Sequence, residues 1–216
     1  MRLPLLLAAL CLAAPATAAV MPVATEFGAD TATRSTATGF DWLDLNRSYG
    51  GIAETDVRLA PGGDLASWRR ATTAEVVAFW ADAGVAVTGT GAAPGETADP
   101  AQLAAVLALQ ALVGLTIPMN PSIDLSVGYT AEAADDPASW TIAHLFSRYD
   151  TLVGEYFSAG AIIDDTAPIA PTHPDAEIWG SWLVRAYDVP EPPTAALVAL
   201  MGAALLTFRL RRPRRA

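Results

Sequence analysis

Carboxylates are the side chains of this sequence with the clearest capacity for chemistry. Asp41 and Asp44 lie close together along the chain, and Glu155 and Asp164 form a second candidate pair. Two carboxylates that flank a glycosidic bond can act as general acid and as base or nucleophile, so either pair leaves a secreted hydrolase as an alternative. The sequence contains no Gly-x-Ser-x-Gly elbow, His-Glu-x-x-His motif, phosphate-binding loop or dinucleotide fingerprint. We therefore expect a protein that is not an enzyme and has no catalytic residues.

Metal binding has few candidate ligands. His144 falls in an apolar segment and His173 lies between two prolines, and lone histidines are more often structural than metal-bound. The acidic pairs 135–136 and 164–165 are each followed by turn-forming residues, which leaves calcium as an alternative. No EF-hand spacing is present, so solvated acidic loops are the simpler interpretation. We expect no metal site and no cofactor.

Two helices are predicted among the elements that must position these side chains. Thr72-x-x-Glu75 is a capping box that precedes apolar residues at helical spacing, and it predicts an amphipathic helix that ends near Gly84. Asp99-Pro100 starts a second helix over 101–115, which is apolar on nearly all faces and is predicted to be buried. A membrane span is the alternative for the second helix, but the run is short and two glutamines interrupt it.

Strands are predicted over most of the other apolar segments. Residues 25–38 are interpreted as a lead-in loop or a first edge strand, 46–51 as a turn and 56–65 as a loop. Apolar and polar residues alternate over 123–129, which is typical of a half-buried strand. Further strands are expected at 40–46, 140–146, 154–163 and 178–187. The sequence therefore predicts an α+β fold, in a single domain over residues 19–188 with about two helices.

The N-terminus has the pattern of a secretory signal peptide. Arg2 precedes a leucine-rich apolar stretch, and Ala16-Thr17-Ala18 is a small-x-small cleavage pattern. We expect residues 1–18 to be removed after the secretion machinery has exported the chain. Cys11 is the only cysteine, so its removal would leave an exported domain without disulfides, thiolate metal sites or a cysteine nucleophile.

The C-terminus carries an apolar run with a basic flank. Residues 194–208 contain no charged side chain, and as a helix they would cover about 22 Å of a hydrocarbon core of about 30 Å, so we expect a short transmembrane helix. The positive-inside bias would place the basic flank in the cytoplasm and the preceding domain outside. The arginines of this flank are Arg209, Arg211, Arg212, Arg214 and Arg215.

Prolines hold the segment before this run extended and accessible. The order Val-Pro-Glu-Pro, short apolar helix and arginine cluster resembles the sorting signal of PEP-CTERM proteins, which are exported bacterial proteins processed by a membrane-embedded exosortase. The resemblance implies that residues 189–216 form a sorting signal and that exosortase is a partner. It also implies that the enzyme recognises Val189, Pro190, Glu191 and Pro192. A plain membrane anchor with a proline-rich linker is the alternative interpretation.

The domain between the two signals carries a second resemblance. A Trp-Leu-Asp strand at 42–44, a helix start Trp-Arg-x-Ala-Thr-x-x-Glu-Val at 68–76, and Gly-Ser-Trp-Leu-Val-Arg-Ala at 180–186 look like the ectodomain common among PEP-CTERM proteins. They also resemble, more distantly, bacterial domains whose fold is similar to that of C-type lectins. The alternative drawn from the residues alone is an α+β sandwich whose core contains Trp42, Trp68 and Trp182.

Charge narrows the classes of partner. Residues 19–189 hold 22 of the 23 acidic residues and seven of the thirteen basic residues, so their net charge is near −15. Such a domain repels nucleic acid and anionic lipid. We therefore expect an exported surface or extracellular-matrix protein, held in the inner membrane until processing and then released toward the cell surface or exopolysaccharide. A lectin-like carbohydrate-binding module is the first alternative, and a hydrolase is the second.

Overall fold

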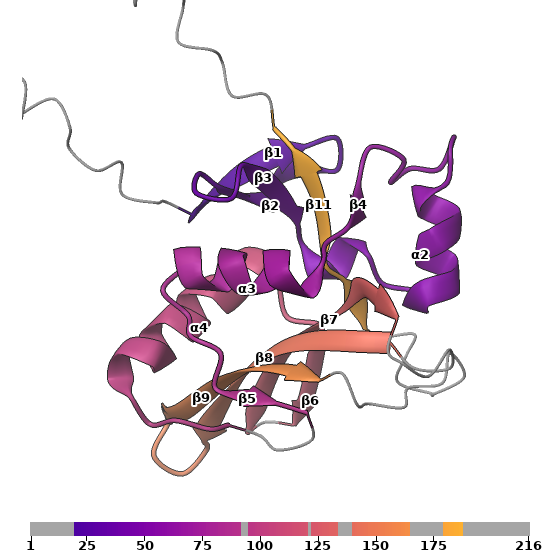
Figure 1. The fold of residues 1–216 in the computed structure, drawn as a ribbon. Helices are drawn as coiled ribbons and strands as arrows, with labels where there is room; N and C mark the ends of the chain where they lie inside the picture. Colours follow the sequence, from indigo (N-terminus) through magenta and orange to yellow (C-terminus); the bar gives the residue numbers. More distant parts are fainter. Residues whose placement is uncertain (1–19, 92–94, 121, 134–139, 165–178, 188–216) are drawn as a thin grey trace, which may run out of the picture. The chain divides into compact units, whose positions relative to one another are not determined.

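The computed structural model describes residues 20–91, 95–120, 122–133, 140–164 and 179–187, and these residues form an α+β fold. The residues up to Ala186 belong to one compact unit, in which two β-sheets are separated by helices (Figure 1). The first sheet has five strands in the order β1-β2-β3-β11-β4. Its strands are β1 (Val20–Thr25), β2 (Gly28–Ser35), β3 (Phe40–Leu43), β11 (Leu183–Ala186) and β4 (Arg69–Arg70).

The second sheet has the order β10-β7-β8-β9-β5, and a further strand, β6 (Ile117–Asn120), pairs with β7. The strand predicted from the alternation over 123–129 is confirmed and continues to Ala133. The strands of this order are β10 (Gly180–Ser181), β7 (Ile123–Ala133), β8 (Trp140–Asp150), β9 (Glu155–Asp164) and β5 (Gly89–Thr90).

Both predicted helices are present. Helix α3 (Thr73–Asp82) begins with the predicted capping box, in which the Thr72 hydroxyl accepts from the Glu75 amide and the Glu75 carboxylate accepts from the Thr72 amide. Helix α4 (Pro100–Val113) begins after Asp99, whose carboxylate accepts from the Ala101 amide. Each start is therefore fixed by side chains that satisfy otherwise free amides of the first turn.

Other expectations need correction. Residues 56–59 were expected in a loop, but they complete a third helix, α2 (Gly51–Leu59). Its first residue is a glycine that follows another glycine, and no side chain caps it, so the usual signal of a helix start is missing. The strand expected over 40–46 ends at Leu43 and is followed by a short 3-10 helix, η1 (Leu45–Arg47). Residues 25–38, interpreted as a lead-in loop or a first edge strand, contain the end of β1 and all of β2, which is an inner strand of the first sheet.

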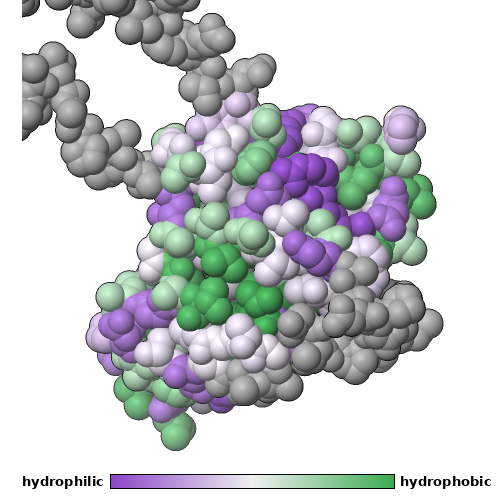
Figure 2. All heavy atoms as spheres, in the orientation of Figure 1, coloured by the Kyte–Doolittle hydropathy of each residue, from purple (hydrophilic) through white to green (hydrophobic). Residues whose placement is uncertain are grey.

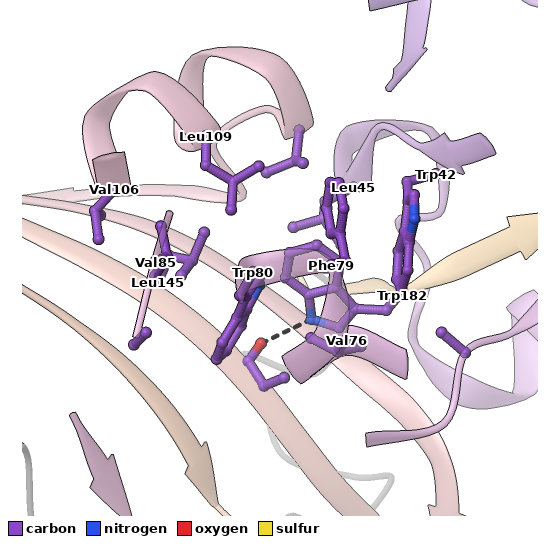
Figure 3. Packing of buried hydrophobic residues seen from close by; sticks show 14 of the residues in the cluster. Trp42, Leu45, Val76, Phe79, Trp80, Val85, Val106, Leu109, Leu145 and Trp182 are labelled. Carbon is purple, nitrogen blue, oxygen red and sulfur yellow. Dashed lines mark hydrogen bonds between the residues drawn. The ribbon is translucent and has the colours of Figure 1, made fainter. Parts of the chain in front are cut away.

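The main core lies where the two sheets and the helices α3 and α4 meet (Figure 3). Trp42 stacks on Phe79 with ring centroids 4.2 Å apart and an angle of 9° between the ring planes. Trp182 lies edge-on to both rings, and its indole N–H donates to the carbonyl of Ala143 in the second sheet at 2.9 Å. Trp42, Trp68 and Trp182 are 1%, 4% and 1% exposed, which confirms the prediction that these three are core residues.

Two of the three sequence segments that carried the ectodomain resemblance, 68–76 and 180–186, are neighbours in space. Strand β4 pairs with β11, so that Arg70 lies opposite Leu183 and Arg69 opposite Val184. The amide of Ala71 also donates to the carbonyl of Trp182 at 2.8 Å. The short strand that leads into α3 is therefore held in place by the last strand of the domain.

The predicted transmembrane helix, 194–208, lies outside the described residues. Within the described part of the chain, no helix combines the length and apolar character that crossing a membrane requires.

Candidate functional site

The predicted sorting residues follow directly after the last strand. Val189, Pro190, Glu191 and Pro192, and the five arginines from Arg209 to Arg215, lie outside the described residues. Ala186 is the last residue of β11, and the described chain ends at Tyr187. The end of β11 is therefore the part of the domain that precedes the sorting motif in the sequence.

The domain begins and ends in one row across the first sheet. Val20 pairs with Ser35, Ser35 with Phe40, and Phe40 with Ala186, so these four residues form a continuous row, here called the terminal row. Adjacent strands lie about 4.8 Å apart, so Val20 and Ala186 are about 15 Å apart across three strand spacings. The first residue of β1 and the last residue of β11 are thus at the same end of one sheet (Figure 1).

The next row of the sheet contains a buried carboxylate between two arginines. Asp41 is 3% exposed and receives two hydrogen bonds from Arg34, from Nε to Oδ1 at 2.7 Å and from the second terminal nitrogen to Oδ2 at 3.0 Å. The Nε of Arg185 lies 3.9 Å from Asp41 Oδ2. A carboxylate held in this way is a structural anion, and it is not available as a catalytic partner for Asp44.

The same guanidinium of Arg185 also contacts two residues outside the sheet row, Trp68 and Glu26. Its guanidinium lies 4.4 Å from the centre of the Trp68 ring and donates to Glu26 at 2.8 Å. The indole N–H of Trp68 donates to the other carboxylate oxygen of Glu26, also at 2.8 Å. Burial opposes ionisation of Glu26, but the hydrogen bonds from Trp68 and Arg185 outweigh it and lower the pKa of Glu26. Glu26 lies in the turn between β1 and β2, so this contact ties the last strand to the first hairpin.

A second arginine covers the terminal row. The guanidinium of Arg69 lies 5.2 Å from the centre of the Phe40 ring and forms two hydrogen bonds with Glu75, at 2.6 and 2.8 Å. The hydrogen bond from Arg69 is the main reason that the pKa of Glu75 falls to about 2, and the same pairing raises the pKa of Arg69. Figure 2 shows hydrophilic side chains gathered over β4 and β11 on the face in view.

Asp44 has a different environment from Asp41. It is 9% exposed, and its Oδ1 has no hydrogen-bond partner among the described residues. Burial raises the pKa of Asp44 to about 6; the positive charge of Arg47 opposes this shift, and the negative charge of Asp30 adds to it. Asp44 therefore keeps its proton to a higher pH than an ordinary aspartate does, and among the described residues no second carboxylate is hydrogen-bonded to it.

The other proposed carboxylate pair cannot act on one bond. Glu155 and Asp164 are the first and last residues of β9, and a strand rises about 3.3 Å per residue, which separates them by about 30 Å. Carboxyl groups of glycoside hydrolases lie about 5–9.5 Å apart. Asp165, Asp135, Asp136 and His173 lie outside the described residues.

His144 lies on β8, on the face of the second sheet that is turned away from Ala143 and Leu145. Burial lowers the pKa of His144, and the charge of Asp164 partly opposes this effect. The described residues contain no group of three or more histidine, cysteine, aspartate or glutamate side chains that is arranged to hold a metal ion.

Several residues of this site were not recognised from the sequence. Nothing in their own sequence segments distinguishes Arg34, Arg185 and Glu26 from ordinary polar residues. Their importance depends on strand register, which places Arg34 and Arg185 on either side of Asp41.

The chain was compared with protein-family models, with curated proteins and with solved structures, and nothing matched it.

Proposed function

We propose that the chain is an exported, non-catalytic surface or matrix protein that an exosortase-type enzyme processes at Val189, Pro190, Glu191 and Pro192. The signal peptide delivers the domain outside the cytoplasm, and the helix over 194–208 holds it in the inner membrane until processing. The arginines after that helix fix its orientation. Cleavage then releases the domain toward the cell surface or exopolysaccharide.

The terminal row is the observation that carries this proposal. Until its signal peptide is cleaved, a domain that is exported behind that peptide and held by a C-terminal helix is tethered to the same membrane at both ends. Its first and last strands should therefore begin and end on one side. Val20, two residues after the expected cleavage site, and Ala186, three residues before Val189, meet this requirement because they share one row of one sheet.

Mass spectrometry of the protein from its native host tests the proposal. We expect a mature form that starts at Ala19 and ends near Pro190, and we expect the variant Glu191→Ala to keep its C-terminus. A Glu177→Ala variant is the control, since it removes another acidic residue from the same half of the chain but outside the motif. If the wild-type chain retains residues through Ala216, the protein is a simple membrane-anchored domain and the sorting proposal is wrong.

Carbohydrate binding by a lectin-like domain is the second candidate function. The pairing of β4 with β11 favours the lectin-like fold, because it joins two of the three segments that carry that resemblance. Two half-buried tryptophans, Trp140 in β8 and Trp179 just before β10, also pack against the cluster that contains Tyr129, and aromatic rings with neighbouring polar groups are typical of ligand sites. Calcium-dependent retention of the domain on exopolysaccharide, lost on substitution of Trp140 or Trp179 by alanine, is the expected result. Equal elution of wild type and variants would exclude it.

A further inference from the structure

We infer that the terminal row is the surface that docks against the sorting enzyme while the tail is being processed. This inference rests on the proposed function and names the part of the domain that the enzyme touches. Three features support it: the short length of chain between β11 and the motif, the local balance of charge, and the contacts that make the end of β11 rigid.

The length of chain limits how far the enzyme can be from the row. Val189 follows Ala186 by three residues, and an extended chain spans at most about 3.5 Å per residue, so the motif begins within about 11 Å of the end of β11. The apolar run starts eight residues after Ala186, within about 28 Å of it. An enzyme that binds this motif therefore holds it within about 11 Å of the end of the first sheet, close enough for the enzyme to touch that end.

The low net charge around the terminal row allows this end of the domain to approach the membrane and the enzyme. The charged side chains that pair at or next to the terminal row are three arginines and four carboxylates, so this end is close to neutral. The remaining part of residues 19–189 carries 18 acidic residues and four arginines, and therefore a net charge near −14. An acidic surface would be repelled by anionic lipid, whereas a neutral end is not. This nearly neutral set is Arg34, Arg69, Arg185, Glu26, Asp41, Glu75 and Asp82.

The row is also held rigidly up to its last residue. Ser35 donates to Asp82 at 2.5 Å, which ties the row to the end of α3. Arg185 is fixed by Glu26 and by the Trp68 ring. The end of β11 is therefore held by its pairing with β3 and by the contacts of Arg185 with Glu26 and Trp68. Holding the end of β11 in place raises the effective concentration of the motif at the enzyme.

A charge reversal with a matched control tests the inference. Arg69 is an exposed arginine at the terminal row with 50% of its side chain accessible, and it pairs with Glu75. Arg148, on the second sheet, is 41% accessible and pairs with Glu96. We expect Arg69→Glu to slow conversion to the mature form at least about fivefold in a pulse-chase experiment in the native host, and Arg148→Glu to leave it unchanged. Equal rates for the two variants would overturn the inference.

A linker insertion gives an independent measurement that leaves the domain intact. Twelve Gly/Ser residues inserted between Tyr187 and Asp188 separate the motif from the row, and we expect processing to slow at least about fivefold because the effective concentration falls. The same insertion after Leu152, in the exposed β8–β9 turn, should have no effect. Unchanged or faster processing with the first insertion would overturn the docking surface. A wild-type chain that is never processed would instead overturn the proposed function, so the two failures are distinguishable.

Discussion

Arg34 and Asp41 form a two-point ion pair across β2 and β3, and the carboxylate in that pair is almost completely buried. The pair lies in the row next to the terminal row, so it holds together the strands through which the chain enters and leaves the domain. The stability of this end of the first sheet therefore depends on an ion pair and not only on apolar packing.

Removing Arg34 should be strongly destabilising. Arg34→Ala leaves Asp41 buried with only the more distant Arg185 as counter-charge, and breaking a buried pair in this way typically costs about 3–5 kcal/mol. Urea unfolding of residues 19–188 measures the change. Arg58→Ala is the control, because Arg58 forms a similar two-point pair with Asp64, whose side chain is 51% exposed. We expect that variant to lose about 0–1 kcal/mol, and comparable losses in the two variants would contradict the role of Asp41 burial.

Trp182 should tolerate even a conservative change poorly. Trp182→Phe removes the hydrogen bond to the Ala143 carbonyl, leaves that carbonyl without this partner and opens a cavity among Trp42, Phe79 and Trp80. The combined cost is about 2–4 kcal/mol, measured as a lower urea midpoint with an unchanged slope. Trp140→Phe is the control, since Trp140 is only partly buried at the edge of a smaller cluster, and it should lose about 1 kcal/mol or less. If both variants unfold at the same urea concentration, Trp182 does not link the two sheets as described.

Local signals predicted part of this fold well. The capping box of Thr72 and Glu75 and the Asp99-Pro100 start are formed by residues only a few positions apart, so the helices α3 and α4 were visible in the sequence. Helix α2 was missed because a Gly-Gly start has no capping side chain. The strand over 123–129 was visible because its alternation reports one buried face.

Interactions between distant segments were not predictable from one sequence. The pairing of β4 with β11 joins residues more than 100 positions apart, and nothing in either segment specifies the other. Asp41 was considered as a possible catalytic group because its type and spacing suggested it. Its partner in the structure is Arg34, which the register of β2 against β3 places opposite Asp41. Arg34 lies in the segment 25–38, which was interpreted from the sequence as a loop or an edge strand. For Glu155 and Asp164, only the knowledge that one straight strand contains both residues excludes a shared site.

The turn between β8 and β9 should accept polar substitutions without loss of stability. Leu152 and Val153 are 95% and 68% exposed, and the turn is held by Asp150, which accepts from both of their amides. Figure 2 shows hydrophobic residues at this tip. We expect Leu152→Ser to change the free energy of unfolding by less than about 0.5 kcal/mol. Leu145→Ala, at a fully buried leucine of the same hairpin, should cost about 2–5 kcal/mol. A large loss from Leu152→Ser would indicate that the tip is covered in the native protein.

Asp44 should make the domain less stable as pH rises. Its pKa is about 6 in the folded state against an ordinary value of 3.8, so the folded chain keeps a proton that the unfolded chain has already lost. The contribution of Asp44 to stability is therefore fully present below about pH 4 and is lost as pH rises through about 6.

Asp44→Asn removes the buried charge, and above pH 6.5 this variant should be more stable than wild type by about 1–3 kcal/mol, with little difference at pH 4. Urea midpoints measured from pH 4 to pH 8 test this, with Glu155→Gln as a control at an exposed acidic residue that does not contribute to the pKa shift of Asp44. If the wild-type and Asp44→Asn curves run parallel across this range, Asp44 is ionised in the folded protein and its oxygen has a partner that the described residues do not supply.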